Sequence, residues 1–255
     1  MKRWFLSRRF GGILWHFVFA GLFIGLSLFL LGVLKGVTWY LVSSALRVLS
    51  GIGILAVCRR LLGQDWRDIL SLCGAKDALL AGSGFLLFFV YYVVTVVSGF
   101  GGITGLTPGI FLSRVLLQQI ATGFYEELNY RYLLLQGERQ TGKSPGMKLL
   151  LVLGSAVLFG LLHCVTGWST YTFLQTGVLG FAFAVIFFVS GNLVIPMLLH
   201  FLYDVIANLA PFVTWNHTAL FDGLNAAFEI MLAGMCMVSL VILVLNIRKT
   251  ARPSV

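Results

Sequence analysis

Residues 11–34 read GGILWHFVFAGLFIGLSLFLLGVL and contain no Asp, Glu, Lys or Arg. A helix needs about 20 predominantly apolar residues to cross the hydrocarbon core of a bilayer, so this stretch predicts a membrane-spanning helix. It is too long for the apolar core of a signal peptide, and no clear A-x-A-like cleavage site lies near it. We therefore expect an uncleaved first span.

The whole chain shares this apolar character. Hydrophobic residues make up 59% of its 255 residues and charged residues 11%, whereas a soluble domain carries roughly 45–50% apolar and about 25% charged residues. This composition excludes a soluble enzyme and a disordered chain. The net charge of +9 is not clustered on a polar face that could bind nucleic acid. We expect an all-α polytopic membrane bundle that contacts membrane lipid and binds no nucleic acid.

Seven further segments are long and apolar enough to cross a bilayer, which gives about eight transmembrane helices in a single transmembrane domain over residues 1–255. The four cysteines show no paired spacing and predict neither a disulfide framework nor a thiolate metal site. The predicted spans are 11–34, 37–58, 78–98, 111–136, 148–167, 172–190, 192–212 and 226–247.

The basic residues predict the orientation of these spans. When eight spans are followed in order, 14 of the 18 Lys and Arg residues fall on one side of the membrane. An excess of Lys and Arg marks the cytoplasmic side, so we expect both termini to be cytoplasmic. The 14 residues are Lys2, Arg3, Arg8, Arg9, Arg59, Arg60, Arg67, Lys76, Arg139, Lys143, Lys148, Arg248, Lys249 and Arg252.

The fourth predicted span is unusually polar. Ionisable residues inside membrane spans are rare and expensive, and residues four apart share one face of a helix. This pattern predicts that the helix turns a broad polar surface to the bundle interior or to a water-filled cavity. The two adjacent stripes are Gln118, Thr122, Glu126 and Tyr130, and Gln119, Gly123, Glu127 and Arg131.

The two glutamates of this span receive different predicted roles. Glu127 stands four residues before Arg131, so the two can form an ion pair that orients the helix. The residue four positions after Glu126 is Tyr130, which offers no such pairing. A buried carboxylate of this kind suits a general base. The alternative is that Glu126 forms a hydrogen bond to a neighbouring helix.

Two later spans carry histidines. His163 lies in the fifth, and His200 and Asp204 lie one helical turn apart in the seventh. Asp204 could orient His200 and fix its tautomer, as carboxylates behind a histidine do; a hydrogen-bond network that packs helices is the alternative. With the acidic pair, these residues could hold and activate a water within a catalytic core at about 111–212. Arg47, in the middle of the second span, has no acid near it on its own helix and requires a partner on another helix, either Asp204 or a carbonyl.

Three motifs occur in order along the chain: E-E-x-x-x-R at Glu126–Arg131, F-x-x-x-H at Phe159–His163 and H-x-x-x-N/D at His200–Asp204. In this order they resemble the CPBP family, the CAAX-processing and bacteriocin-immunity intramembrane proteases. These are also called ABI proteins and are related to the Rce1 prenyl endopeptidase. The motifs cover residues 126–204, whereas the first three spans resemble the family only in hydropathy.

The resemblance implies an endopeptidase that acts near the cytoplasmic side of the membrane, with Glu126, Glu127, Arg131, His163, His200 and Asp204 as its site residues. Glu126 would activate the attacking water and His163 would help to hold it. His200 and Asp204 would bind the oxyanion or position the substrate. The prenyl-protein enzyme has Asn at the last position, and an ionised Asp cannot donate to an oxyanion. Asp204 therefore either orients His200 or stays protonated.

The sequence leaves two chemistries open. Glu126, His163 and His200 could bind Zn²⁺ and keep one coordination position open, as in a metalloprotease. The same groups could also act without a metal, as in a glutamate protease. No H-E-x-x-H motif occurs, so a zincin site is not predicted.

The leading interpretation is a multi-pass protease of the cell membrane that cleaves a peptide or membrane-anchored protein. One alternative is a non-enzymatic immunity or chaperone-like protein on the same scaffold. Another is a transporter with a charged cavity, although no inverted repeat is visible. The natural substrate and the oligomeric state are left open.

Overall fold

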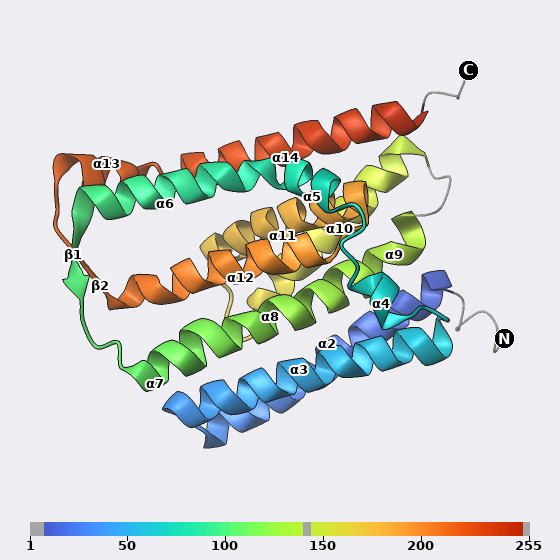
Figure 1. The fold of residues 1–255 in the computed structure, drawn as a ribbon, viewed down its shortest axis with the longest axis horizontal. Coiled ribbons are helices and arrows are strands. Elements are labelled where there is room, and N and C mark those ends of the chain that lie inside the picture. Colours follow the sequence, from blue (N-terminus) through green and yellow to red (C-terminus); the bar gives the residue numbers. More distant parts are fainter. Residues whose placement is uncertain (1–7, 140–143, 252–255) are drawn as a thin grey trace. The chain divides into compact units, whose positions relative to one another are not determined.

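A computed structural model describes residues 8–139 and 144–251, and helices account for most of them (Figure 1). In this described part, 7 helices are long and apolar enough to cross a membrane. They coincide with seven of the predicted spans, and the prediction of an all-α polytopic membrane bundle is confirmed. The seven are Gly11–Val33, Gly36–Leu61, Ala75–Gly99, Pro145–His163, Thr170–Ser190, Val194–Phe212 and Phe228–Lys249.

The remaining predicted span, 111–136, is also helical but is built differently. Its helix changes type along its length, and residues 111–136 carry four charged side chains. These features separate it from the seven clean apolar helices. Its segments are α7 (Pro108–Ile110), the π-helical η2 (Phe111–Leu117), α8 (Gln118–Glu126), the π-helical η3 (Glu127–Leu133) and α9 (Leu134–Arg139).

The contacts within the chain group it into two compact units. That these form a single transmembrane domain over 1–255 stays a prediction. The first unit comprises residues 1–73, 104–138 and 192–212, and the second comprises 74–103, 139–191 and 213–255. The predicted core at 111–212 therefore contributes to both units. The division follows from packing between segments far apart in the sequence, which periodicity does not reveal.

The first unit centres on α8. Besides α7 to α9, it contains α2 (Arg8–Val33), α3 (Gly36–Leu61), the short α4 (Trp66–Ile69), α12 (Val194–Leu209) and η4 (Ala210–Phe212). Only Leu34 and Lys35 connect α2 to α3, so the two helices form an antiparallel hairpin (Figure 1). Gly36 takes a φ of +56° at this turn, a conformation that costs glycine little because it has no Cβ.

The second unit is a helical bundle with a small β-ribbon. Its α10 and α11 are antiparallel and closely packed, since a Cβ at Gly160 would lie 2.8 Å from the carbonyl oxygen of Phe173. β1 and β2 pair antiparallel, with Ile103 opposite Val213. The elements are α5 (Ala75–Ala81), η1 (Gly82–Gly84), α6 (Phe85–Gly99), β1 (Phe100–Ile103), α10 (Pro145–His163), α11 (Thr170–Ser190), β2 (Val213–Trp215), α13 (Ala219–Ala226) and α14 (Phe228–Ala251).

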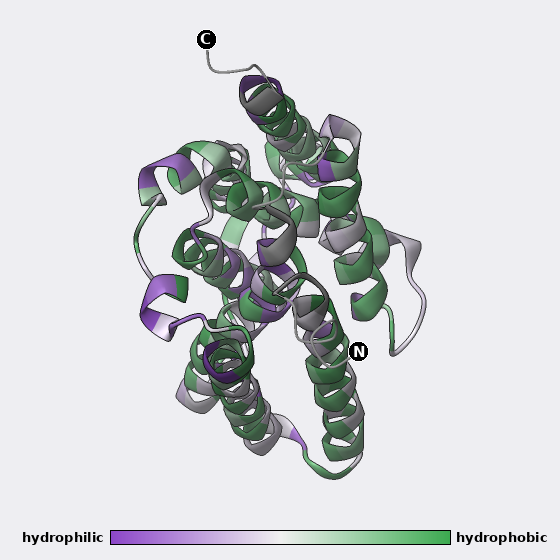
Figure 2. Cartoon of the chain, turned by 90° about the vertical axis from the view of Figure 1, so that its right-hand side faces the viewer, coloured by the Kyte–Doolittle hydropathy of each residue, from purple (hydrophilic) through white to green (hydrophobic). Residues whose placement is uncertain are grey.

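Large apolar side chains cover the outer faces of the helices, and hydrophobic residues dominate the ribbon in Figure 2. Val97 is 83% exposed, and Leu22, Phe29 and Ile230 are also exposed. Soluble monomers rarely expose contiguous apolar patches larger than a few hundred Å². Lipid is the solvent in which such surfaces are stable, so the described helices fit a bilayer.

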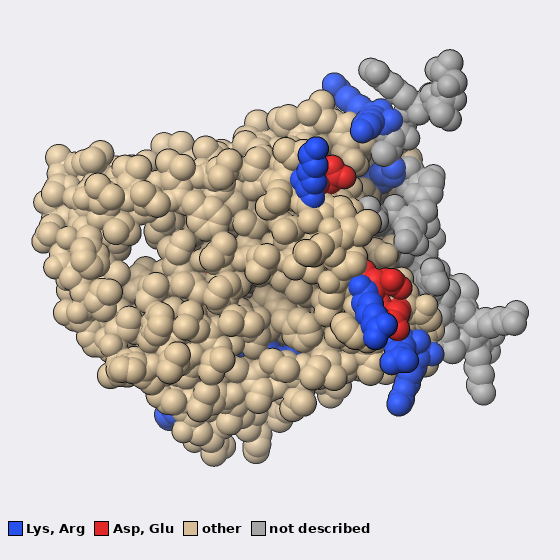
Figure 3. Space-filling view, in the orientation of Figure 1, with Lys and Arg blue, Asp and Glu red and all other residues tan. Residues whose placement is uncertain are grey.

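Basic residues gather at one end of the helices in each unit. In the first, Arg59 and Arg60 lie in the last turn of α3, the end at which the antiparallel α2 begins. In the second, Arg248 and Lys249 lie in the last turn of α14. The antiparallel α5 starts at that end, and Lys76 is its second residue. Figure 3 shows most of the visible charged side chains in compact groups on a surface that is otherwise uncharged. The cytoplasmic assignment stays a prediction, and Lys2, Arg3, Lys143 and Arg252 lie outside the described residues.

Candidate active site

The acidic pair lies where the helix changes its winding. α8 ends at Glu126 and the π-helical η3 begins at Glu127. In a π turn the backbone bonds span five residues instead of four, and such turns are frequent at functional sites. All seven residues of η3 are buried. The polar side chains of η3 therefore lie in the interior of the first unit. They follow directly on Glu126, the last residue of α8.

Glu127 and Arg131 form the predicted ion pair. Arg131 Nε lies 3.2 Å from Glu127 Oε2, and both side chains are 0% exposed. Breaking a buried pair by removing one partner is strongly destabilising, because it leaves an uncompensated charge. The pair therefore fixes the orientation of η3 and gives Glu127 a defined position.

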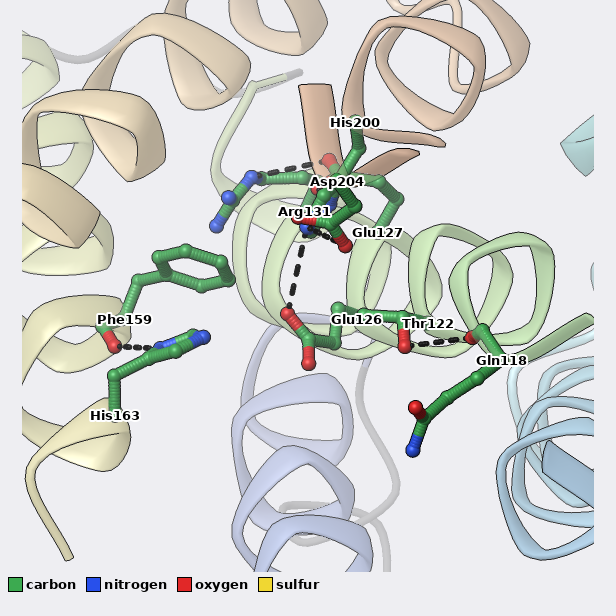
Figure 4. A network of polar contacts seen from close by, with 9 residues as sticks. All are labelled: Gln118, Thr122, Glu126, Glu127, Arg131, Phe159, His163, His200 and Asp204. Atoms are coloured by element: carbon green, nitrogen blue, oxygen red, sulfur yellow. Dashed lines mark hydrogen bonds and ion pairs between the residues drawn. The ribbon is translucent and has the colours of Figure 1, made fainter. Parts of the chain in front are cut away.

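Glu127 also holds His200 of α12. Its Oε1 lies 2.9 Å from His200 Nδ1, where an N–H of the ring donates to the carboxylate. Arg131, Glu127 and His200 thus form a chain of three contacts, visible in Figure 4. Because Nδ1 is engaged, the other ring nitrogen, Nε2, is the atom of His200 that faces the rest of the site.

Two further carboxylates lie near that nitrogen. Glu126 Oε2 is 3.8 Å and Asp204 Oδ2 is 3.5 Å from His200 Nε2. Their side chains are 10% and 17% exposed, in contrast to the complete burial of Glu127. Glu126 and Asp204 are therefore the less completely buried carboxylates of this cluster.

A glycine in α8 allows this approach of α12. A Cβ at Gly123 would lie 2.9 Å from the carbonyl oxygen of Met197, closer than side-chain carbons normally come to a backbone oxygen. With hydrogen in its place, α8 and α12 pack backbone to backbone. The close packing brings His200, which is one turn further along α12, within reach of both glutamates.

His200 has a carboxylate partner that the sequence did not predict. The sequence suggested that Asp204 orients His200, but Glu127 is the carboxylate within hydrogen-bond distance of Nδ1. Asp204 lies beside Nε2 instead. The reason is tertiary, since Glu127 precedes His200 by 73 residues and reaches it only because α8 and α12 pack together.

Several polar side chains of the predicted stripes at residues 118–131 form hydrogen bonds to backbone carbonyls of their own helix. Thr122 donates to the carbonyl of Gln118 at 2.8 Å, and Gln119 donates to the carbonyl of Arg114 at 2.8 Å. Arg114 in turn donates to Asn208 Oδ1 of α12 at 3.3 Å. Of these contacts, the one between Arg114 and Asn208 joins this helix to α12.

His163 lies in the second unit, at the last position of α10. Its Nδ1 is 2.7 Å from the carbonyl oxygen of Phe159, and the two rings lie 4.5 Å apart between centroids (Figure 4). The F-x-x-x-H motif thus describes a local arrangement in which the phenylalanine one turn earlier supports the histidine. That His163 shares the site of Glu126 and His200 stays a prediction.

Two residues of the first unit matter more than their sequence context suggested. His16 is fully buried, and its Nδ1 lies 3.1 Å from the carbonyl oxygen of Asn129 in η3. Arg47 is bound by the carbonyl and the hydroxyl of Ser43, one turn earlier in α3. These hydrogen bonds lie within α3, so the prediction of a hydrogen-bond partner on another helix is wrong for Arg47. The sequence signal for both is a polar residue within an apolar span, and their partners follow only from packing.

A metal ion was one of the predicted possibilities for this site. Among the described residues, the structure brings together no group of three or more His, Cys, Asp and Glu side chains that could hold one. Of the three candidates, Glu126 and His200 lie together, and His163 belongs to the other unit. Zinc binding at this site stays a prediction, and no step proposed below passes through a metal.

The fold and this cluster define a multi-pass helical membrane protein with carboxylates and a histidine in the interior of one unit. Residues 108–206 match the family described as "Type II CAAX prenyl endopeptidase Rce1-like". The match confirms the resemblance predicted from the three motifs, and the matched segment is similar to the domain of this family. It includes all six predicted site residues, but neither His16 nor Arg47. No curated protein and no solved structure matches the chain.

Proposed function

We propose that the chain is an intramembrane endopeptidase of the cell membrane that hydrolyses a peptide bond in a membrane-associated peptide or protein. One observation carries the proposal. A partly accessible carboxylate, Glu126, lies beside a histidine whose other nitrogen is held by the fully buried Glu127–Arg131 pair. A base that water can reach, next to a ring fixed in orientation, suits the activation of that water.

In the proposed reaction, Glu126 removes a proton from a water, and the water oxygen attacks the carbonyl carbon of the substrate. The electron pair of the C=O bond moves to the oxygen, which becomes an oxyanion. Collapse of this intermediate breaks the C–N bond, and Glu126 returns the proton to the leaving amine. One water is consumed, and a carboxylic acid and an amine are formed.

His200 is the proposed stabiliser of the oxyanion. With Nδ1 donating to Glu127, Nε2 donates to the oxyanion when the ring carries a proton on both nitrogens. Asp204, near Nε2, either steadies that ring or, when protonated, donates to the oxyanion itself. We assign to His163 the holding of the attacking water, a role that rests on the family resemblance.

Comparative proteomics of membranes tests this function before any substrate has been identified. Membranes that contain the wild-type chain should accumulate new peptide ends, and membranes that contain Glu126→Gln should not. Glu229→Gln is a matched control, since it removes a carboxylate from α14 of the second unit. Identical peptide ends in all three membranes would contradict the protease and favour the non-enzymatic or transport alternatives.

The same assay decides between the two chemistries. Loss of activity on addition of a chelator, with recovery on addition of Zn²⁺, would show that a metal assists the reaction. Activity that persists in the chelator would show that the carboxylate acts alone.

A further inference from the structure

Arg47 lies inside the first unit, on the face of α3 that packs against α8. One turn before it, Ser43 is fully buried and accepts a hydrogen bond from Gln118 Nε2 at 3.2 Å. One turn after it, a Cβ at Gly51 would lie 2.3 Å from the ring of Phe124. Arg47 is therefore enclosed between two contacts with α8, and its guanidinium cannot point into lipid.

The hydrogen-bond and ring contacts of Arg47 within the described chain are all with neutral groups. It binds the carbonyl and hydroxyl of Ser43, and its guanidinium carbon lies 4.8 Å from the centroid of the Phe23 ring. Glu126 and Asp204 act on it electrostatically from a greater distance. A charged side chain in a membrane interior is expensive, and such residues typically pair with one another or mark a functional site.

Hydrogen-bond donors converge around this cation. Arginine has five N–H donors and no acceptor; here Nη1 binds Ser43, whereas Nε is buried without a hydrogen-bond partner in the described structure. The Ser43 oxygen accepts from both Arg47 and Gln118, so its own O–H remains a donor. Three side chains of the first unit thus present N–H and O–H groups beside a positive charge, which suits a carboxylate.

We propose that Arg47, Ser43 and Gln118 form a subsite for a carboxylate of the substrate peptide. This rests on the proposed function, because it assigns specificity to the same site. Because Ser43 contacts Gln118 and Gly51 contacts Phe124, Arg47 lies opposite the part of α8 that is about five residues before Glu126. Five residues correspond to about 7 Å along the axis of α8. Gln118 and Glu126 lie along this one helix in Figure 4. An extended peptide rises about 3.3 Å per residue, so the bound carboxylate belongs about two residues from the cleaved bond.

The carboxylate comes either from the C-terminus of the peptide or from an acidic side chain. Both sources offer two oxygens to the planar fork of arginine. Lysine lacks this fork and binds as a point charge. Arg47→Lys therefore keeps the charge and loses the geometry, whereas Arg47→Gln loses both.

Binding to the full-length Glu126→Gln protein in lipid nanodiscs tests the subsite without cleavage. The probes are a fluorescent apolar hexapeptide with a free C-terminal carboxylate, its C-terminal amide, and that amide with one internal glutamate. We expect one of the two carboxylate peptides to bind about tenfold or more tightly than the plain amide, the size of one charge-assisted hydrogen bond. The peptide that binds more tightly shows whether the subsite binds a C-terminal carboxylate or an acidic side chain.

Adding Arg47→Gln should abolish this preference and leave the affinity for the plain amide unchanged. Arg47→Lys should keep part of it, and Ser43→Ala provides a second variant with a smaller change in packing. Arg114→Gln is the control, because it removes another arginine of the same unit that binds Asn208. A parent protein without preference, or a preference that survives in Arg47→Gln and Ser43→Ala, overturns the subsite.

The two proposals fail separately. A carboxylate preference in a protein that leaves no new peptide ends in membranes would retain the subsite and refute the protease. Glu126-dependent cleavage without any carboxylate preference would retain the protease and refute the subsite.

Discussion

The helices α8–η3 and α11 are both largely buried, yet they bury opposite kinds of residue. Glu127, Asn129 and Arg131 are 0% exposed in η3. In α11, residues 179–188 are buried and all are apolar or glycine. Inside a membrane protein, an apolar buried helix supplies packing alone. A buried helix with polar side chains needs a hydrogen-bond or ion-pair partner for each of them. Such a helix therefore indicates a polar site that the surrounding helices enclose.

The largest effect is expected from Glu126→Gln. The change keeps the shape of the side chain but removes the base, and a general base typically contributes ~10²–10⁴-fold to a rate. Peptide hydrolysis by the purified protein should fall by this factor, while thermal unfolding stays at the wild-type temperature. Cleavage at the wild-type rate would refute a carboxylate base.

Arg131→Met should affect stability and activity together. It leaves Glu127 buried without its ion pair, which costs about 3–5 kcal/mol, and it frees the residue that holds His200. We expect a lower unfolding temperature and a lower rate per folded molecule. The double variant Glu127→Gln with Arg131→Met should recover part of the stability but not the rate, because the buried charge is gone and a neutral amide oxygen holds His200 more weakly than a carboxylate does.

Phe183→Ala in α11 provides the opposite case. Phe183 is fully buried and stacks on Phe85 with ring centroids 5.1 Å apart. Removing a buried phenylalanine side chain costs about 3–5 kcal/mol. The unfolding temperature should fall as far as in Arg131→Met, but the rate per folded molecule should not change. An equal loss of rate would show that α11 contributes more than packing.

His16→Phe should have a smaller effect that reaches the site through η3. His16 binds the carbonyl of Asn129 and contacts the Tyr130 ring edge-on at 5.0 Å between centroids. Losing a buried hydrogen bond costs about 1–3 kcal/mol. We expect the rate to fall with KM unchanged, and His16→Gln, which retains a donor, to restore most of it. Equal rates in both variants would limit His16 to packing.

The smallest effect is expected from Asp204→Asn. Glu127, rather than Asp204, holds Nδ1 of His200, and asparagine retains a donor at the position beside Nε2. Activity should therefore stay within about tenfold of wild type, since no general base is lost. A loss as large as that of Glu126→Gln, with tight binding of an uncleaved peptide, would show that the ionised carboxylate is required.

Local chemistry was readable from the sequence. Glu127 and Arg131 stand one helical turn apart, so their pair follows from helix geometry, and the distance of 3.2 Å confirms it. Asp204, one turn along the same helix, does lie 3.5 Å from His200 Nε2, but the partner of Nδ1 was not readable. Packing gave that place to Glu127, and no spacing within α12 could have indicated this.

The sequence by itself determined the apolar spans, the polar helix among them and the three motifs, because bilayer thickness and helical periodicity act on neighbouring residues. Only the tertiary structure decided which groups meet. The π turn after Glu126, the close approach of α12 at Gly123 and the hydrogen bond from Gln118 to Ser43 depend on contacts between distant segments. Such contacts form where whole helix surfaces fit together, and no local pattern encodes that fit.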